Sequence, residues 1–149
     1  MDLIPIGTIE SPQGEAVDEG WGDVVSAIRL QSGLGVGMQG LDEFSHAVVV
    51  FYMHEARFDW QNDLVRRPRG MEDMPEIGIF AQRARSRPNS IGVTAVEIVS
   101  VEGDCVFVKG LDAINGTPVL DLKPYFPAFD YVDHARIPDW VSSLMEGYF

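Results

Sequence analysis

Arginines lead into a tight turn in residues 78–92, and this combination is suited to binding an anion. Arg83, Arg85 and Arg87 precede a Pro-Asn turn that contains Asn89. A guanidinium group pairs with carboxylates and phosphates in a bidentate manner, so the choice of arginine fits anion recognition. Any one of these arginines can instead pair with acidic side chains of the same protein. The segment predicts an anion-binding loop, with internal ion pairs as the alternative.

A second segment, residues 110–125, holds turn-forming pairs beside charged side chains. Its Asn-Gly and Thr-Pro pairs at 115–118 indicate a tight backbone. Backbone groups of such a turn can face a ligand, and Asp112, Asp121 and Lys123 are close by in the sequence. Loops so constrained position ligands more often than they merely connect strands. We expect this turn to hold a ligand, with a purely structural turn as the alternative.

Metal and covalent chemistry find no support in the sequence. His46 and His54 would lie about 26 Å apart on one strand, because each residue adds about 3.3 Å, and one ion cannot bridge them. Cys105 is the single cysteine and has no second thiol for a disulfide or a zinc site. The sequence contains neither a G-x-S-x-G elbow nor a phosphate-binding P-loop. No metal site is expected.

Charge is distributed unevenly along the chain. The 149 residues include 11 Lys and Arg and 23 Asp and Glu, a formal charge of −12, which excludes a generally basic nucleic-acid module. Seven of the basic residues, all arginines, lie in residues 57–87 with five acidic residues, so this stretch nets +2. The remaining 4 basic and 18 acidic residues net −14. The chain is therefore an acidic body with one arginine-rich segment.

The elements that must position these residues are mostly strands. Short β-branched or aromatic runs are bounded by Gly, Pro, Asn and Asp, and the three residues 102–104 have the length of a tight hairpin turn. With 46% hydrophobic residues, the chain is expected to fold as one all-β domain over residues 1–149, a closed or partly open β-barrel at about 3–130. The six expected strands are residues 3–9, 24–30, 46–54, 77–81, 91–101 and 105–109.

Helix is expected at two places only. Residues 57–65 have apolar side chains near helical spacing, and Pro68 limits this helix to about two turns. Residues 138–146 combine a proline at a first-turn position with one apolar face, which predicts a short C-terminal helix packed on the barrel or on a partner. Residues 66–76 lack periodicity and are expected to form an exposed loop.

No feature of the sequence points to a membrane or to secretion. The longest apolar run, residues 47–53, is far shorter than the roughly 20 residues of a membrane span. The first residues lack a basic region followed by an apolar one. Together with the single cysteine, these observations favour a cytoplasmic protein.

Several motifs, in this order along the chain, resemble the TsaA-like, or TrmO/VirR, family. They are residues 44–46, 51–54, 78–83 with 87–92, and 110–125, and the resemblance spans about residues 4–130. It implies a single β-barrel that binds S-adenosylmethionine, acts as a homodimer, and belongs to a class of methyltransferase distinct from the Rossmann type. The characterised bacterial branch methylates N6-threonylcarbamoyladenosine next to the anticodon of certain threonine tRNAs.

The resemblance also implies roles for individual residues. Arg83 would hold the carboxylate of S-adenosylmethionine, the 115–118 turn would meet the adenine edge, and Glu55 would favour the sulfonium. Methyl transfer is an in-line displacement that needs alignment and a deprotonated nucleophile rather than a metal. The cofactor-binding candidates are His54, Glu55, Arg83, Val93, Asn115, Gly116, Thr117 and Pro118; the substrate-binding candidates are Arg85, Arg87 and Asn89; and the catalytic candidates are Asp121, Lys123 and Tyr125.

One departure from the family concerns the methyl acceptor. Where the tRNA-modifying branch has a Pro-Arg-Gln segment after its first Ser-Pro, this chain has the acidic residues 15–22, which end in Trp21-Gly22 and are similar to the VirR-like branch. We expect an S-adenosylmethionine-dependent methyltransferase whose first candidate acceptor is the modified adenosine of tRNA, with no DNA partner. The alternatives are a regulatory module that binds S-adenosylmethionine without turnover, and a methyltransferase for a small molecule or a protein.

Overall fold

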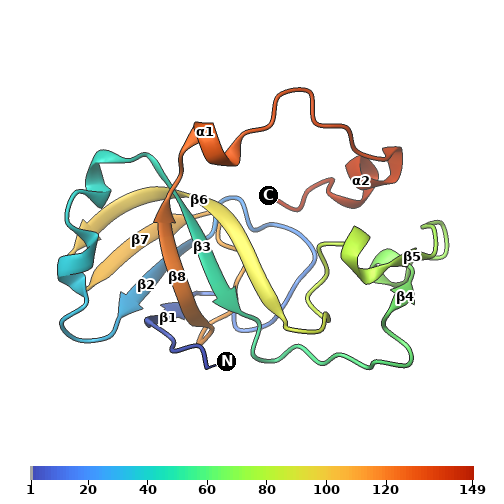
Figure 1. Ribbon diagram of the computed structural model, residues 1–149, viewed down its shortest axis with the longest axis horizontal. Coiled ribbons are helices and arrows are strands. Elements are labelled where there is room, and N and C mark those ends of the chain that lie inside the picture. Colours follow the sequence, from blue (N-terminus) through green and yellow to red (C-terminus); the bar gives the residue numbers. More distant parts are fainter. Residues whose placement is uncertain (1) are drawn as a thin grey trace.

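A computed structural model describes residues 2–149 and shows six antiparallel strands closed into a barrel (Figure 1). The strands pair in the order β1-β2-β7-β6-β3-β8 around the barrel. This confirms the expected all-β barrel. The strands are β1 (Gly7–Glu10), β2 (Val25–Leu30), β3 (His46–Tyr52), β6 (Ile91–Glu102), β7 (Cys105–Lys109) and β8 (Pro118–Pro124).

The core of the barrel follows from the two-residue period of its strands. In β3, Ala47, Val49 and Phe51 point inward and are buried, while the residues between them face outward. Ile28 of β2 and Val106 of β7 are completely buried in the same cluster. Because the sheet is closed, the barrel has no unpaired edge strand. Each strand is paired on both sides, which fixes the positions of the strand ends from which the loops begin.

The hairpin expected at residues 102–104 is confirmed, but one of the expected barrel strands is wrong. The sixth barrel strand is β8, which pairs with β1 and β3, and not residues 77–81. Residues 77–78 form β5 (Ile77–Gly78), which pairs with β4 (Val65–Arg66) in a separate two-stranded sheet. The amide of Gln82 donates to the carbonyl of Ile79, so the chain turns into a 3-10 helix after β5 instead of continuing as a strand.

The helix expected over residues 57–65 is also wrong. The Asp59 carboxylate accepts hydrogen bonds from the Gln61 amide and the Asn62 side chain, and the Asp59 amide donates to the Asp63 carboxylate. Such local polar bonds offer the backbone an alternative to helix. The C-terminal helix is confirmed as α2 (Asp139–Leu144), two residues shorter at its C-terminal end than expected, and one turn of helix, α1 (Pro127–Asp130), precedes it.

Residues 57–87 project from the barrel and are called the arginine arm below. The arm contains β4, β5 and the 3-10 helices η3 (Pro68–Gly70) and η4 (Ile79–Ala81), and it lies at the right of Figure 1 in green. Pro68 and Met74 are buried, and the Arg67 side chain donates to the carbonyl of Met74. Most of residues 66–76 are nevertheless exposed and lie outside helix and strand, so the expected exposed loop is largely confirmed, with Pro68 and Met74 as its buried residues.

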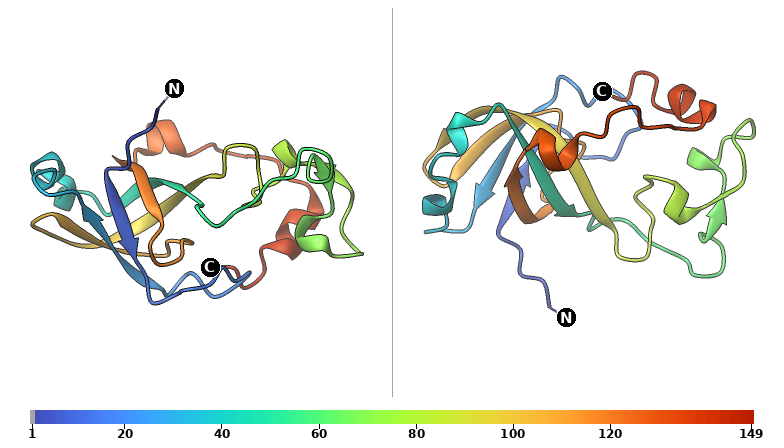
Figure 2. Two further views of the ribbon diagram at one scale, coloured as in Figure 1. Left: turned by 90° about the horizontal axis from the view of Figure 1, so that it is seen from below. Right: turned by 45° about the horizontal axis from the view of Figure 1, so that its top comes forward.

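Two further 3-10 helices and the C-terminal segment complete the fold. The helices η1 (Gly35–Met38) and η2 (Leu41–Glu43) connect β2 to β3. Figure 2 shows from two other directions that α2 lies beside the arginine arm. None of the helices found in residues 2–149 is both long enough and apolar enough to cross a membrane.

Candidate functional site

The residues expected to bind a ligand gather at one end of the barrel. His54 and Glu55 follow the end of β3, Val93 lies near the start of β6, and the turn 115–118 leads directly into β8. β3 pairs with both β6 and β8 in antiparallel fashion, so the end of β3 is adjacent to the starts of its two neighbours. Tertiary structure thus brings together segments, 54–55 and 115–118, that are at least 60 residues apart in the sequence.

The turn 115–118 is held by the barrel through its backbone amides. The amide of Asn115 donates to the carbonyl of Gln13 at 2.7 Å, and the amide of Gly116 donates to the carbonyl of Ile9 at 2.8 Å. Thr117 is buried. Gly116 has a φ of +83°, in the left-handed region that favours glycine. The expectation of free amides is therefore wrong: these amides fix the turn, and it is the exposed side of Asn115 and Gly116 that faces solvent.

Arg83 joins the arginine arm to the barrel. Its guanidinium donates to the backbone carbonyl of Val93 in β6, so two candidate cofactor residues lie in direct contact. A guanidinium has five N–H donors, and one bond to a carbonyl leaves others for a ligand. A carbonyl is neutral, so this contact orients the side chain without cancelling its charge. Arg83 is thus a fixed cation at the edge of the site.

The other arginines of the arm are held in a similar way. Arg87 donates to the carbonyl of Gln82 at 3.1 Å, and Arg66 donates to the carbonyl of Ser86 at 3.2 Å. Carboxylate partners occur at Arg66, which is 3.6 Å from Asp63, and at Arg69, which is 3.7 Å from Asp18. The alternative of internal ion pairs therefore applies to some of the arginines only. Arg85, a candidate substrate residue, is exposed.

A hollow of about 350 Å³ lies beside the start of β8. It contains Asn89 and Pro118, so it brings one candidate substrate residue next to one candidate cofactor residue. Its remaining lining is Tyr52, Ile91 and Leu120 with Leu3 and Pro5 of the N-terminal segment. An apolar lining with a few polar groups, at a volume of some hundreds of Å³, is typical of a small-molecule site.

The catalytic candidates are spread along the outside of β8. Asp121 and Lys123 form an ion pair with 2.5 Å between the carboxylate oxygen and Nζ. Tyr125 follows the other end of the strand and its ring lies 6.3 Å from that of His46. The seven residue-to-residue steps from Pro118 to Tyr125 span roughly 23 Å at about 3.3 Å each. The structure thus keeps Asp121 within reach of the site end of β8 and separates Tyr125 from it.

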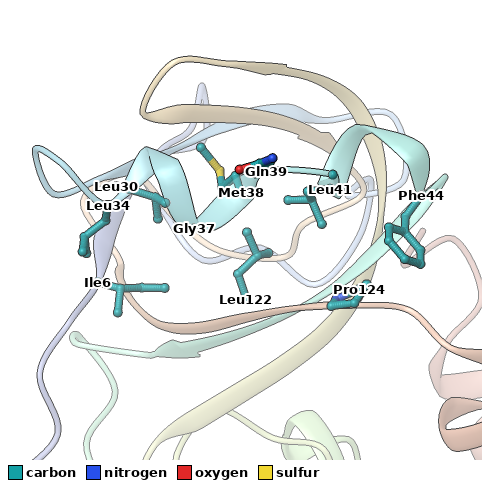
Figure 3. A pocket seen from close by; sticks show the side chains of 11 residues that line it. Ile6, Leu30, Leu34, Gly37, Met38, Gln39, Leu41, Phe44, Leu122 and Pro124 are labelled. Atoms are coloured by element: carbon teal, nitrogen blue, oxygen red, sulfur yellow. The ribbon is translucent and has the colours of Figure 1, made fainter.

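A second hollow, of about 270 Å³, lies at the opposite end of the barrel (Figure 3). Side chains such as Met38, Leu41 and Leu122 point into it from η1, η2 and β8. Gln39 supplies the only polar side chain among the lining residues. None of the candidate site residues lines this hollow, so it is not part of the candidate ligand site.

Asp112 and Tyr148 form a contact that sequence reasoning missed. The Tyr148 hydroxyl donates to one Asp112 carboxylate oxygen at 2.6 Å, and the Thr94 hydroxyl donates to the other. Burial, reinforced by the neighbouring Asp112 charge, raises the pKa of Tyr148 far above its ordinary value, so the phenol remains a donor. No sequence signal links residues 36 positions apart, and hydroxyl groups occupy both oxygens of Asp112.

Tyr148 also ties together three parts of the chain. Its carbonyl accepts a hydrogen bond from the amide of Trp21 at 2.9 Å, and the guanidinium of Arg69 lies 5.8 Å from the centre of its ring. The acidic segment, the arginine arm and the barrel therefore meet at the C-terminal segment. This contact stabilises the relative placement of the arm and the end of the barrel.

Replacing Tyr148 by phenylalanine is expected to change how stability depends on alkaline pH. Because the folded-state pKa of Tyr148 is raised, the contribution of the neutral phenol is complete below about pH 10 and is lost as the pH rises above it, where the unfolded chain ionises first. Thermal unfolding midpoints should therefore fall more steeply with alkaline pH in the wild type than in Tyr148→Phe. Tyr131→Phe, at an exposed tyrosine, is the matched control and should behave like the wild type.

Residues 2–149 contain no group of three His, Cys, Asp or Glu side chains placed to hold a metal ion. The single cysteine, Cys105, is buried, and burial raises the pKa of its thiol. A thiol with a raised pKa is less nucleophilic at neutral pH because less of it is thiolate. The chemistry of the site thus rests on cations, carboxylates and a constrained turn.

Comparisons with known proteins show which family this chain belongs to. The family model described as "tRNA-methyltransferase O N-terminal domain" matches residues 12–131. An S-adenosyl-L-methionine-binding protein of Archaeoglobus fulgidus is 37% identical over 137 residues, which cover 89% of this chain and 95% of that protein. The tRNA (adenine(37)-N6)-methyltransferase of Mus musculus is 40% identical over 93 residues, which cover 62% of this chain.

A solved structure shares the fold over nearly the whole chain. The crystal structure of TrmO from Pseudomonas aeruginosa superposes with a TM-score of 0.74 at 30% identity and covers 93% of this chain. This chain spans 63% of that solved chain and only 21% of the mouse enzyme. The similarity thus covers the barrel and its loops, whereas those two proteins contain additional sequence.

Proposed function

Because this chain belongs to the family of the tRNA-methyltransferase O N-terminal domain, we propose that it binds S-adenosylmethionine at the Arg83 end of the barrel and transfers its methyl group. The observation that carries the proposal is the contact of Arg83 with Val93, at the same end of the barrel as the turn 115–118. It places a fixed cation, an exposed apolar side chain and a constrained turn at one end of the barrel. The Archaeoglobus relative, of similar length, is named for binding this cofactor.

The residues at this end fit the chemical groups of S-adenosylmethionine. Arg83 is positioned to hold the carboxylate, and the exposed side of the turn 115–118 can accept hydrogen bonds from an adenine edge. Glu55, exposed after β3, favours a cation such as the sulfonium, and Val93 and His54 supply contact surface. When bound, the cofactor supplies a methyl group that is transferred by in-line displacement, for which this chain provides alignment.

The acceptor that we propose is an adenosine of tRNA. Arg83 and Arg87 of the arginine arm donate to neutral carbonyls, so their positive charge remains to attract phosphate in a protein that is otherwise acidic. Arg85, Arg87 and Asn89 are the substrate residues of this proposal. The mouse relative is named as a tRNA adenine methyltransferase. A tRNA substrate also favours the cytoplasm as the compartment.

One further function remains a candidate, a regulatory module that binds S-adenosylmethionine without turnover. Two comparisons favour it. This chain covers 95% of the Archaeoglobus relative, which is named only for binding S-adenosylmethionine, but covers only 21% of the mouse protein that is named as a methyltransferase. A methyltransferase for a small molecule or a protein is the other alternative, which the acidic body of the chain favours.

Transfer of a labelled methyl group tests the proposed function directly. The purified protein should move the label from S-adenosylmethionine to tRNA taken from cells that lack the gene, and mass spectrometry should find the label on an N6-modified adenosine. If S-adenosylmethionine binds but no tRNA, peptide or metabolite pool acquires label, the regulatory module is the better description. If label reaches protein or metabolites only, the tRNA acceptor is wrong.

We also propose that the protein is a homodimer. Val48 and Val50 of β3 and Val93 of β6 share the outer face of the barrel, where β3 and β6 pair. Val93 is 43% exposed, and Tyr52 on the same face is 41% exposed. Light scattering should report about twice the chain mass of 16.5 kDa, and Val50→Glu should return it to the monomer value. A monomer in the wild type would contradict this.

A further inference from the structure

Two large aromatic side chains of the arginine arm are exposed to solvent. Trp60 is 66% exposed and Phe80 is 78% exposed. Trp21, in contrast, is almost completely buried. Flat apolar rings at a surface are costly to keep in water and mark contact sites more often than scattered aliphatic residues do. These two rings are not used by the core of the arm or of the barrel.

The structure places the two rings on adjoining parts of the arm. The amide of Ile79, the neighbour of Phe80, donates to the carbonyl of Leu64 at 2.9 Å. Trp60 precedes Leu64 by four residues, a chain distance of at most about 14 Å. Phe58 packs edge-on against Trp60 with 5.1 Å between ring centres, which orients the indole. A single extended ligand of modest length can therefore reach both rings.

Exposed arginines lie close in sequence to both rings. Arg57 and Arg85 are exposed and lie within five residues of Trp60 and Phe80, respectively. Arg83 is bonded to a carbonyl and keeps its charge. Acidic side chains are also present: Asp63 faces Arg66, whereas the Asp59 carboxylate, next to Trp60, accepts hydrogen bonds from neutral groups of its own turn and keeps its negative charge. The surface therefore combines oriented cations with exposed flat rings.

We propose that Trp60 and Phe80 form a stacking surface for unpaired bases of an RNA strand, whose phosphates are bound by the surrounding arginines. Single-stranded RNA offers both required features, a polyanionic backbone and a series of flat bases, and base–aromatic stacking contributes substantially to binding such strands. An acidic peptide would satisfy the arginines but not two exposed rings. The inference rests on the proposed function for the identity of the RNA, but not for the binding itself.

Exposure of an aromatic ring is not by itself sufficient to predict RNA binding. Phe129 in α1 is 81% exposed, comparable with Phe80, yet it lies in the acidic body next to Asp130. No arginine or lysine lies within five residues of Phe129, whereas Arg57 and Arg85 lie that close to Trp60 and Phe80. Phe129 therefore provides a matched control that removes an equally exposed ring from a segment without neighbouring arginines.

Fluorescence titration with an unmodified single-stranded RNA oligonucleotide, without S-adenosylmethionine, tests the proposal. The RNA should quench the emission of Trp60, and Phe80→Ala and Trp60→Ala should each weaken RNA binding, measured by anisotropy of labelled RNA, about five- to a hundredfold. Trp60→Phe should retain most of the affinity because it keeps a ring. Phe129→Ala should bind as the wild type does, and affinity should fall steeply with salt.

Several outcomes would overturn the proposal. Wild-type affinity in both alanine variants would show that the rings do not stack on bases. Equal weakening in Trp60→Phe and Trp60→Ala would point to loss of local structure instead. If Phe80→Ala has a smaller mass than the wild type in light scattering but binds RNA with unchanged affinity, the rings contact a second copy of the chain and not RNA. Calorimetry with S-adenosylmethionine tests the proposed function separately from RNA binding. If no heat of binding is found, the proposed function is contradicted, but the proposal that the arm binds RNA is not affected.

Discussion

Replacing Arg83 by alanine is expected to weaken S-adenosylmethionine binding about ten- to a hundredfold while the barrel stays folded. The guanidinium is fixed on the carbonyl of Val93, at the junction of the arm and β6. In the proposed function it pairs with the carboxylate of the cofactor. Hydrogen bonds to charged groups contribute about 1.5–3 kcal/mol, which corresponds to this range of affinity. Isothermal titration calorimetry with the wild type and the variant measures the change.

Arg85→Ala is the matched control for this prediction. It removes the same charge two residues away, from an exposed side chain, and should leave S-adenosylmethionine affinity nearly unchanged. Loss of affinity in both variants would show that general electrostatic attraction matters more than the position of Arg83. Unchanged affinity in Arg83→Ala, or no heat with the wild type, would show that the cofactor site is elsewhere or absent.

Replacing Trp21 by alanine is expected to lower the free energy of unfolding by about 3–5 kcal/mol, the usual cost of truncating a buried tryptophan. The side chain is only 2% exposed, and its indole N–H donates to the carbonyl of Val17 at 3.1 Å. Its backbone amide bonds to the carbonyl of Tyr148, so the cavity would also loosen the C-terminal segment. Urea unfolding followed by circular dichroism measures the difference.

Trp60→Ala provides the comparison, since it removes the same side chain from an exposed position. Its effect on stability should stay within about 0.5 kcal/mol. A small effect of Trp21→Ala would mean that the acidic segment is not part of the packed structure. Equal losses of stability in Trp21→Ala and Trp60→Ala would mean that the arm depends on Trp60 for its own folding. The Trp60→Ala variant would then be a poor test of RNA binding.

The burial of Trp21 could not be predicted from the sequence. Its segment contains several acids and stands where the tRNA-modifying branch has a Pro-Arg-Gln segment, which gives no sign of a buried side chain. In the structure the segment pairs through its backbone with residues 147–148 at the C-terminus, and the tryptophan is buried there. The burial depends on a partner more than 120 residues away, which no local pattern encodes.

Strand β8 and residues 77–81 show the same limit for the fold. Residues 77–81 have the apolar composition of a strand, yet they fold onto the arm because β4 pairs with β5 there. β8 alternates buried apolar with charged outward residues and begins and ends with proline, so turn signals hid it. Strand pairing is decided by which segments can close the barrel together, and that is a property of the whole chain.

The arginines and turn that first indicated a ligand site were identifiable from residue types alone, because guanidinium chemistry and turn propensity are local properties. The same holds for the barrel class, the hairpin at 102–104 and the C-terminal helix, which follow from short-range periodicity and turn residues. Only the tertiary structure decided that Arg83 contacts Val93, that Tyr125 lies at the far end of β8, and that Asp112 is occupied by Tyr148. These relations depend on antiparallel pairing and burial between distant segments, whose free energy arises only when the chain is packed.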